Sequence, residues 1–98
     1  MRRNELVDAL RGKYPLQAEG VTPLDSVALL AVDRGILSLM CVPDTAELTR
    51  EHLLGVVQGV IGHYEGMRHR VPEAVLSELE EQQKRVVADV QAMIDAAD

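Results

Sequence analysis

Hydrophobic residues recur at spacings of three and four along most of the chain, and this period predicts helices rather than strands. The first segment fits a short helix that Asn4 would cap and that Gly12 and Pro15 would end. Its apolar face would carry Leu6, Val7 and Leu10. Residues 15–21 have no such period and are predicted to form a loop.

A second helix is predicted to begin at Thr22, because a threonine cap is followed by Pro23 at the first helical position and by the acidic Asp25. Residues 24–32 are apolar nearly all round, which indicates the central element of the fold. Gly35 is expected to end this helix in the left-handed conformation.

Residues 36–42 form the most ambiguous segment, since a short apolar run fits either a buried strand or another helical turn or two. A strand would need a partner, and no second convincing strand occurs, so helix is favoured. Pro43 breaks the pattern. Asp44 with Glu47 then resembles a capping box for a third helix that runs to about His69.

The third and fourth helices are predicted to form an antiparallel hairpin. Val71 precedes Pro72, and the residue before a proline is pushed away from helical geometry, so the third helix should end here. Pro72 would then open a fourth helix from Glu73 to about Ala96, and so short a connection folds the two helices back on each other. A single kinked helix is the alternative.

The fourth helix carries a packing seam with the alternating spacing of a heptad repeat. On its outer surface, Glu80 is expected to pair with Lys84, and Glu81 with Arg85. The chain is therefore predicted to be all-α, a single domain over residues 1–98 built as a small bundle of about four helices. The seam positions are Leu76, Leu79, Gln83, Val86, Val90, Met93 and Ala97.

A stripe of four glycines distinguishes the third helix. Gly55, Gly59, Gly62 and Gly66 fall within roughly 40° of one line on a helical wheel, opposite the broad apolar half of the helix. Each glycine in a helix interior costs about 1 kcal/mol relative to alanine, so a close contact should compensate. The stripe fits the docking of a protein partner or a second copy, a tight internal crossing with the first or second helix, or a helix that tolerates the weakness.

Polar side chains border the stripe and make it a shallow groove, which we interpret as an interface. Stripes of this spacing drive helix dimerisation in membranes, but the flanking charges exclude that setting here. The candidate interface residues are His52, Gly55, Gly59, Gly62, His63, Gly66 and Arg70.

The charge balance constrains the partner. A net charge of −6 argues against direct binding to nucleic acid, which depends on Lys and Arg neutralising phosphates. The longest apolar tract, residues 24–42, contains Asp25, Asp33 and Arg34, so no membrane partner is expected. A lone cysteine, Cys41, fits a reducing cytoplasm and is expected to be a buried small hydrophobe.

Residue patterns typical of catalysis are missing from the sequence. It has no glycine-rich phosphate loop, no zinc-type Cys/His spacing and no nucleophile elbow, so we expect no catalytic residue, no cofactor and no enzyme. Glu65 and His69 stand at i and i+4 and could supply two metal ligands, but a third must come from elsewhere. We therefore favour an ordinary surface pair and predict no metal site.

These observations lead to the expectation of a non-enzymatic protein–protein interaction module that docks a helical face on a partner or self-associates as a homodimer. Arginine outnumbers lysine, as in GC-rich genomes, which favours a phage-encoded or bacterial regulator or inhibitor of a host protein. One alternative is a small helical metal-binding protein or enzyme that uses Glu65 and His69. Another is an acidic decoy of nucleic acid that acts through carboxylates of the fourth helix.

Overall fold

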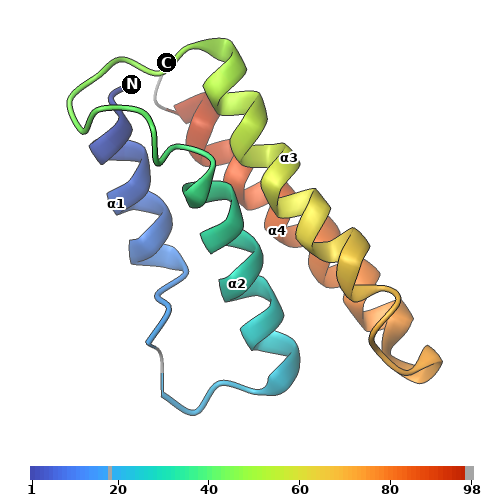
Figure 1. Ribbon diagram of the computed structural model, residues 1–98. Helices are drawn as coiled ribbons and strands as arrows, with labels where there is room; N and C mark the ends of the chain where they lie inside the picture. Colours follow the sequence, from blue (N-terminus) through green and yellow to red (C-terminus); the bar gives the residue numbers. More distant parts are fainter. Residues whose placement is uncertain (18, 97–98) are drawn as a thin grey trace.

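The computed structural model describes residues 1–17 and 19–96, and within them it is an all-helical bundle (Figure 1). The predicted fold class is confirmed, with four α-helices and one short 3₁₀ turn. The helices are α1 (Arg3–Lys13), α2 (Pro23–Leu37), α3 (Arg50–Met67) and α4 (Leu76–Ala96), with the 3₁₀ turn η1 (Glu73–Val75) before α4.

Helix α1 begins at Arg3 and has no side-chain cap, so the predicted cap at Asn4 is wrong. The first backbone N–H groups of the helix instead bond to a distant loop: Arg3 N–H donates to the Ala46 carbonyl at 3.0 Å, and Asn4 N–H to the Asp44 carbonyl at 2.9 Å. A tertiary partner thus satisfies the groups that a cap would have satisfied.

Helix α2 starts as predicted, because the Thr22 hydroxyl accepts a hydrogen bond from Asp25 N–H at 3.1 Å. It does not end at Gly35. Among the described residues the positive φ belongs to Gly20, whereas Gly35 continues the helix to Leu37. Residues 38–42 then form consecutive turns and no strand, with Leu39 buried and Cys41 exposed.

The exposure of Cys41 contradicts the expectation of a buried small hydrophobe. The expectation assumed that the whole run 36–42 lies in the core. Once the helix ends, the turns direct Leu39 and Val42 inward and leave Met40 and Cys41 outside.

Helix α3 begins later than predicted. Its cap is Thr49, whose hydroxyl accepts from His52 N–H at 3.2 Å while His52 Nδ1 accepts from Thr49 N–H at 3.0 Å. The predicted capping box at Asp44 and Glu47 is wrong, because these carboxylates instead pair with Arg3 and with the amino group of Met1. Both pairs join the loop to the start of α1.

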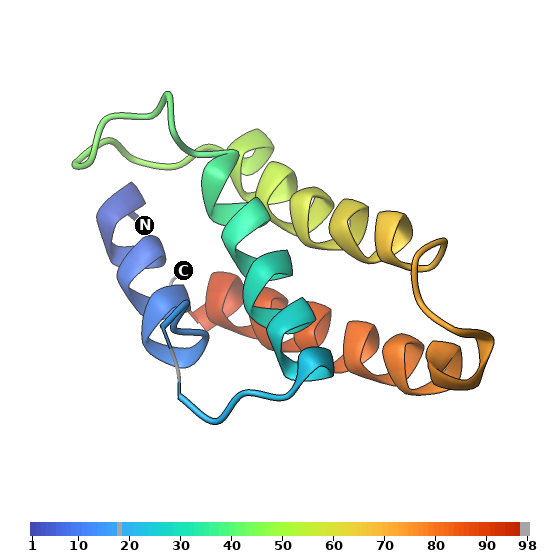
Figure 2. The same cartoon turned by 60° about the horizontal axis from the view of Figure 1, so that its bottom comes forward.

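Helices α3 and α4 contact each other, and Figures 1 and 2 show α4 returning alongside α3 from the turn that contains Pro72. Helix α3 ends at Met67, two residues before the predicted His69. Helix α2 contacts α1, α3 and α4, with its largest contact on α3, and α4 likewise contacts the other three helices. The turn between α3 and α4 extends past α2 in both views (Figure 2).

Apart from Tyr64, the buried apolar residues that the structure describes are aliphatic, and Tyr64 takes part in a buried polar link between three helices. Tyr64 of α3 is fully buried, and its hydroxyl donates to Gln82 Oε1 of α4 at 2.7 Å. Gln82 Nε2 donates to the Leu24 carbonyl in the first turn of α2 at 2.8 Å. Buried polar groups that are satisfied in this way fix the relative register of the helices they join.

The seam of α4 is shifted from the predicted heptad. The structure buries Gln82 in place of Gln83, and Ile94 more deeply than Met93. Ala97, the last predicted seam position, lies outside the described residues. The predicted surface pairs are also replaced by others, since Lys84 lies 3.6 Å from Glu81 and Glu80 lies 3.1 Å from Arg68.

Candidate functional site: a basic cavity on the glycine face of α3

Helices α2 and α3 cross in backbone contact at two glycines. A methyl group placed on Gly59 would lie 2.9 Å from the Gly35 Cα atom and 3.0 Å from the Arg34 carbonyl oxygen. A methyl group on Gly35 would lie 2.8 Å from the Val56 carbonyl oxygen. Side chains cannot be accommodated at such distances without separating the helices, so both glycines are required by the crossing.

The other glycines of the stripe are not packed in this way. A methyl group on Gly55 would make an ordinary contact, 3.8 Å from the Ser38 hydroxyl oxygen. At Gly62 and Gly66 nothing lies within 4 Å of the added methyl group. The stripe therefore divides into an internal crossing at Gly59 and an open half at Gly62 and Gly66.

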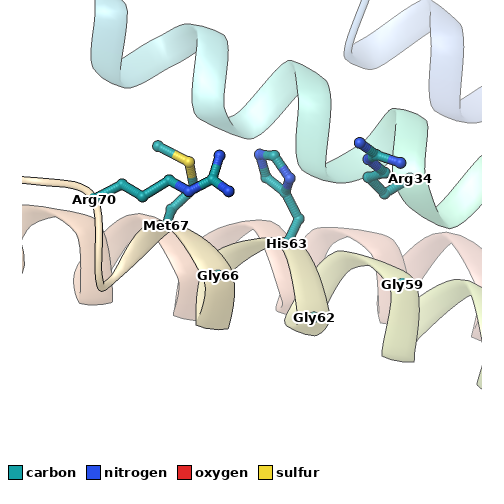
Figure 3. Close-up of a pocket in the computed structure, with 7 residues that line it drawn as sticks. All are labelled: Arg34, Gly59, Gly62, His63, Gly66, Met67 and Arg70. Atoms are coloured by element: carbon teal, nitrogen blue, oxygen red, sulfur yellow. The ribbon is translucent and has the colours of Figure 1, made fainter.

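The open half forms the floor of a cavity of about 430 Å³. His63 and Met67 project from α3 toward α2, and Arg70 extends back from the turn beyond α3 into the same space (Figure 3). Arg34 reaches the cavity from α2. The lining residues are Arg34, Gly59, Gly62, His63, Gly66, Met67 and Arg70.

The charged groups of this cavity are all basic, although the chain has sixteen acidic residues against ten Lys and Arg. No carboxylate from the described part of the chain lines it. The nearest acidic residue along α2, Asp33, lies 3.7 Å from Arg11 of α1 and is thus engaged elsewhere. The cavity is a local basic site on an acidic protein.

His63 occupies the middle of the cavity and has an unusual environment. Its Nε2 atom is shielded from solvent and has no hydrogen-bond partner among the described residues. Burial lowers the pKa of His63 below its ordinary value, and the nearby guanidinium groups of Arg34 and Arg70 lower it further. All three effects disfavour the charged imidazolium.

The structure brings together most, but not all, of the residues predicted from the glycine stripe. Gly59, Gly62, His63, Gly66 and Arg70 line the cavity. The other two predicted interface residues lie apart from it, His52 in the cap of α3 and Gly55 beside Ser38.

Sequence reasoning missed Arg34, Met67 and Gly35. Met67 is partly buried as well as lining the cavity. Gly35 was expected to end the second helix. Close crossings need a small residue on each helix, but the sequence does not show which glycine of the second helix would meet the stripe.

A second groove lies along α3 and α4 and is less suited to binding a charged group. Its volume is about 700 Å³, and its walls include Ile61 and Val87. The charged side chains there are already paired, Arg68 with Glu80 at 3.1 Å and Lys84 with Glu81 at 3.6 Å. Its cations are neutralised within the chain, unlike those of the basic cavity.

In the described part of the chain, no third ligand joins Glu65 and His69 to form a metal site. Glu65 and His69 are both exposed, and His69 lies in the turn beyond α3. Within residues 1–17 and 19–96, no three His, Cys, Asp or Glu side chains gather closely enough to hold a metal ion.

Comparisons with models of protein families, with curated proteins and with solved structures find no match to the chain. In the described part of the chain, no helix combines the length and the apolar character needed to cross a membrane. Functional inference therefore depends on the cavity itself.

Proposed function

We propose that this protein is a non-catalytic interaction module that docks the open half of the α3 glycine face on a protein partner. The observation that carries the proposal is the floor of the basic cavity. Gly62 and Gly66 each weaken the helix by up to about 1 kcal/mol relative to alanine, yet no neighbouring group in residues 1–17 or 19–96 comes within 4 Å of the positions their Cβ atoms would take. A partner that approaches the exposed backbone would account for both glycines.

The partner is either a different protein or a second copy of the chain. A net charge of −6 disfavours a polyanion such as nucleic acid, because phosphate contacts need an excess of Lys and Arg. We place the module in the cytoplasm, where Cys41, which is exposed, would stay reduced. A bacterial or phage-encoded regulator is the form of this function that we favour.

Leucine substitutions test whether the open half of the face is an interface. A Cβ atom at Gly62 would have no neighbour within 4 Å among the described residues, so we expect Gly62→Leu to project into the cavity, retain the fold and lose docking. Gly12→Leu is the matched control, because Gly12 is also a helical glycine with nothing within 4 Å and lies on α1, away from the cavity. Circular dichroism establishes that both variants fold.

Two measurements read out docking. Sedimentation equilibrium detects a second copy, and affinity capture from the native host followed by mass spectrometry detects a different protein. We expect the wild type and Gly12→Leu to give the same complex and Gly62→Leu to lose it. An unchanged complex in Gly62→Leu would show that the interface lies elsewhere.

A further inference from the structure

Two arginines, Arg34 and Arg70, supply the positive charge of the basic cavity. Neither Arg34 nor Arg70 forms an ion pair or a side-chain hydrogen bond with any residue in 1–17 or 19–96. Most of the other cations are paired; Arg11, for example, lies 3.7 Å from Asp33. The fold brings two unneutralised guanidinium groups into one cavity.

The arrangement of the two side chains places positive charge on both sides of one ring. Figure 3 shows Arg34 reaching the cavity from α2 and Arg70 from the turn beyond α3, with His63 between them. The positive charges of both arginines lower the pKa of His63. Two positive charges on either side of one ring repel each other, and an anion held between them would offset that repulsion.

The floor of the cavity leaves room for such an anion. Gly62 and Gly66 present backbone without side chains, and no atom lies within 4 Å of the positions that their Cβ atoms would take. Guanidinium groups bind carboxylate and phosphoryl oxygens through paired N–H donors. The site thus combines donors, positive charge and space.

We propose that this cavity binds a single oxyanion, a carboxylate or a phosphoryl group, between the guanidinium groups of Arg34 and Arg70 and above Gly62 and Gly66. The proposal rests on the proposed function, since the oxyanion would belong to the docked protein. The cavity presents two cations, which match the charge of one carboxylate or phosphoryl group. The rest of the chain is acidic, with a net charge of −6 overall.

Binding of the oxyanion has a direct consequence for His63. A negative charge between the two guanidinium groups offsets their effect on the imidazole, so the pKa of His63 should rise when the anion binds. The imidazole then reports occupancy of the cavity without any partner being present.

The experiment is a histidine-detected NMR titration of the isolated full chain. The probes are inorganic phosphate and acetate, each added at constant ionic strength against sodium chloride. We expect one or both anions to raise the pKa of His63 and to shift the backbone resonances of Gly62 and Gly66. A response to acetate alone identifies a carboxylate as the ligand group, and a response to phosphate alone identifies a phosphoryl group.

Substitutions connect the response to the two arginines. Arg34→Gln or Arg70→Gln should each weaken anion binding on the order of tenfold, as expected when one charge-assisted hydrogen-bonding partner is removed. Arg50→Gln is the control, because Arg50 lies on the same helix as His63 but outside the cavity. It should bind like the wild type.

Absence of any anion-specific change at His63, or an equal change in the Arg34→Gln/Arg70→Gln double variant, would overturn the proposed oxyanion site. That result would leave the docking function open, since Gly62→Leu tests docking through complex formation. Conversely, a bound anion in a protein whose complexes are unaffected by Gly62→Leu would support the site and refute the docking function.

Discussion

Alanine substitutions along the glycine stripe should change stability in opposite directions, although the residue changes are identical. At Gly62, alanine gains about 0.5–1 kcal/mol from helix propensity and chain entropy, and nothing opposes it because no atom lies within 4 Å. Gly62→Ala should therefore raise the melting temperature by several degrees, at about 4–8 °C per kcal/mol for a domain of this size.

At Gly59 the same gain meets a steric cost. The new methyl group would lie 2.9 Å from the Gly35 Cα atom and 3.0 Å from the Arg34 carbonyl oxygen, both of them backbone atoms that cannot rotate away. Overpacking of this kind costs about 1–3 kcal/mol. Both variants gain the same stability from the higher helix propensity of alanine. Gly59→Ala should therefore be less stable than Gly62→Ala by about the whole overpacking cost.

Urea unfolding followed by circular dichroism measures this difference. Gly35→Ala should behave like Gly59→Ala, because its methyl group would lie 2.8 Å from the Val56 carbonyl oxygen. The two variants place the new group on opposite sides of the same crossing. If Gly59→Ala proved as stabilising as Gly62→Ala, the backbone contact between α2 and α3 would be refuted.

Two further predictions concern polar groups. Tyr64→Phe removes the buried donor to Gln82 Oε1 and should lower the free energy of unfolding by about 1–3 kcal/mol, whereas an unchanged unfolding midpoint would contradict this link. The pKa of His63 is lower in the folded chain than its ordinary value, so the unfolded state binds more protons below about pH 6.5 and stability falls as the pH drops through that value. The stability of His63→Gln, measured by urea unfolding between pH 5 and 8, should vary less with pH than that of the wild type, and equal slopes would exclude His63 as the cause.

Local sequence signals predicted the parts of the fold that local contacts determine. Thr22 caps α2 as its pattern indicates, and α3 ends before Val71 and Pro72. The prediction failed where a distant residue provides the partner. Asp44 is a residue type that often caps helices, but its carboxylate pairs with Arg3 instead. A pairing between residues so far apart in the chain cannot be deduced from the local sequence pattern.

The candidate site was predictable from one helix and not from its neighbour. The helical wheel of α3 places Gly62, His63 and Gly66 on one face, and these residues do line the cavity. Arg34 could not be assigned, because its contribution depends on where α2 crosses α3. That crossing is set by Gly35, which the sequence allows equally as a helix terminator.

The stripe has two halves, and the stability that each loses through its glycines has to be offset by a different contact. The crossing at Gly35 and Gly59 accounts for one glycine of α3, since a closer approach of two helices increases the packing between them. It does nothing for Gly62 and Gly66, which lie beyond the crossing where no atom comes within 4 Å. A helix selected only for stability would carry alanine at both positions, at a gain of up to about 1 kcal/mol each. Their position beside two arginines without a counter-ion among the described residues fits the proposed binding site, because a ligand needs both the space and the charge.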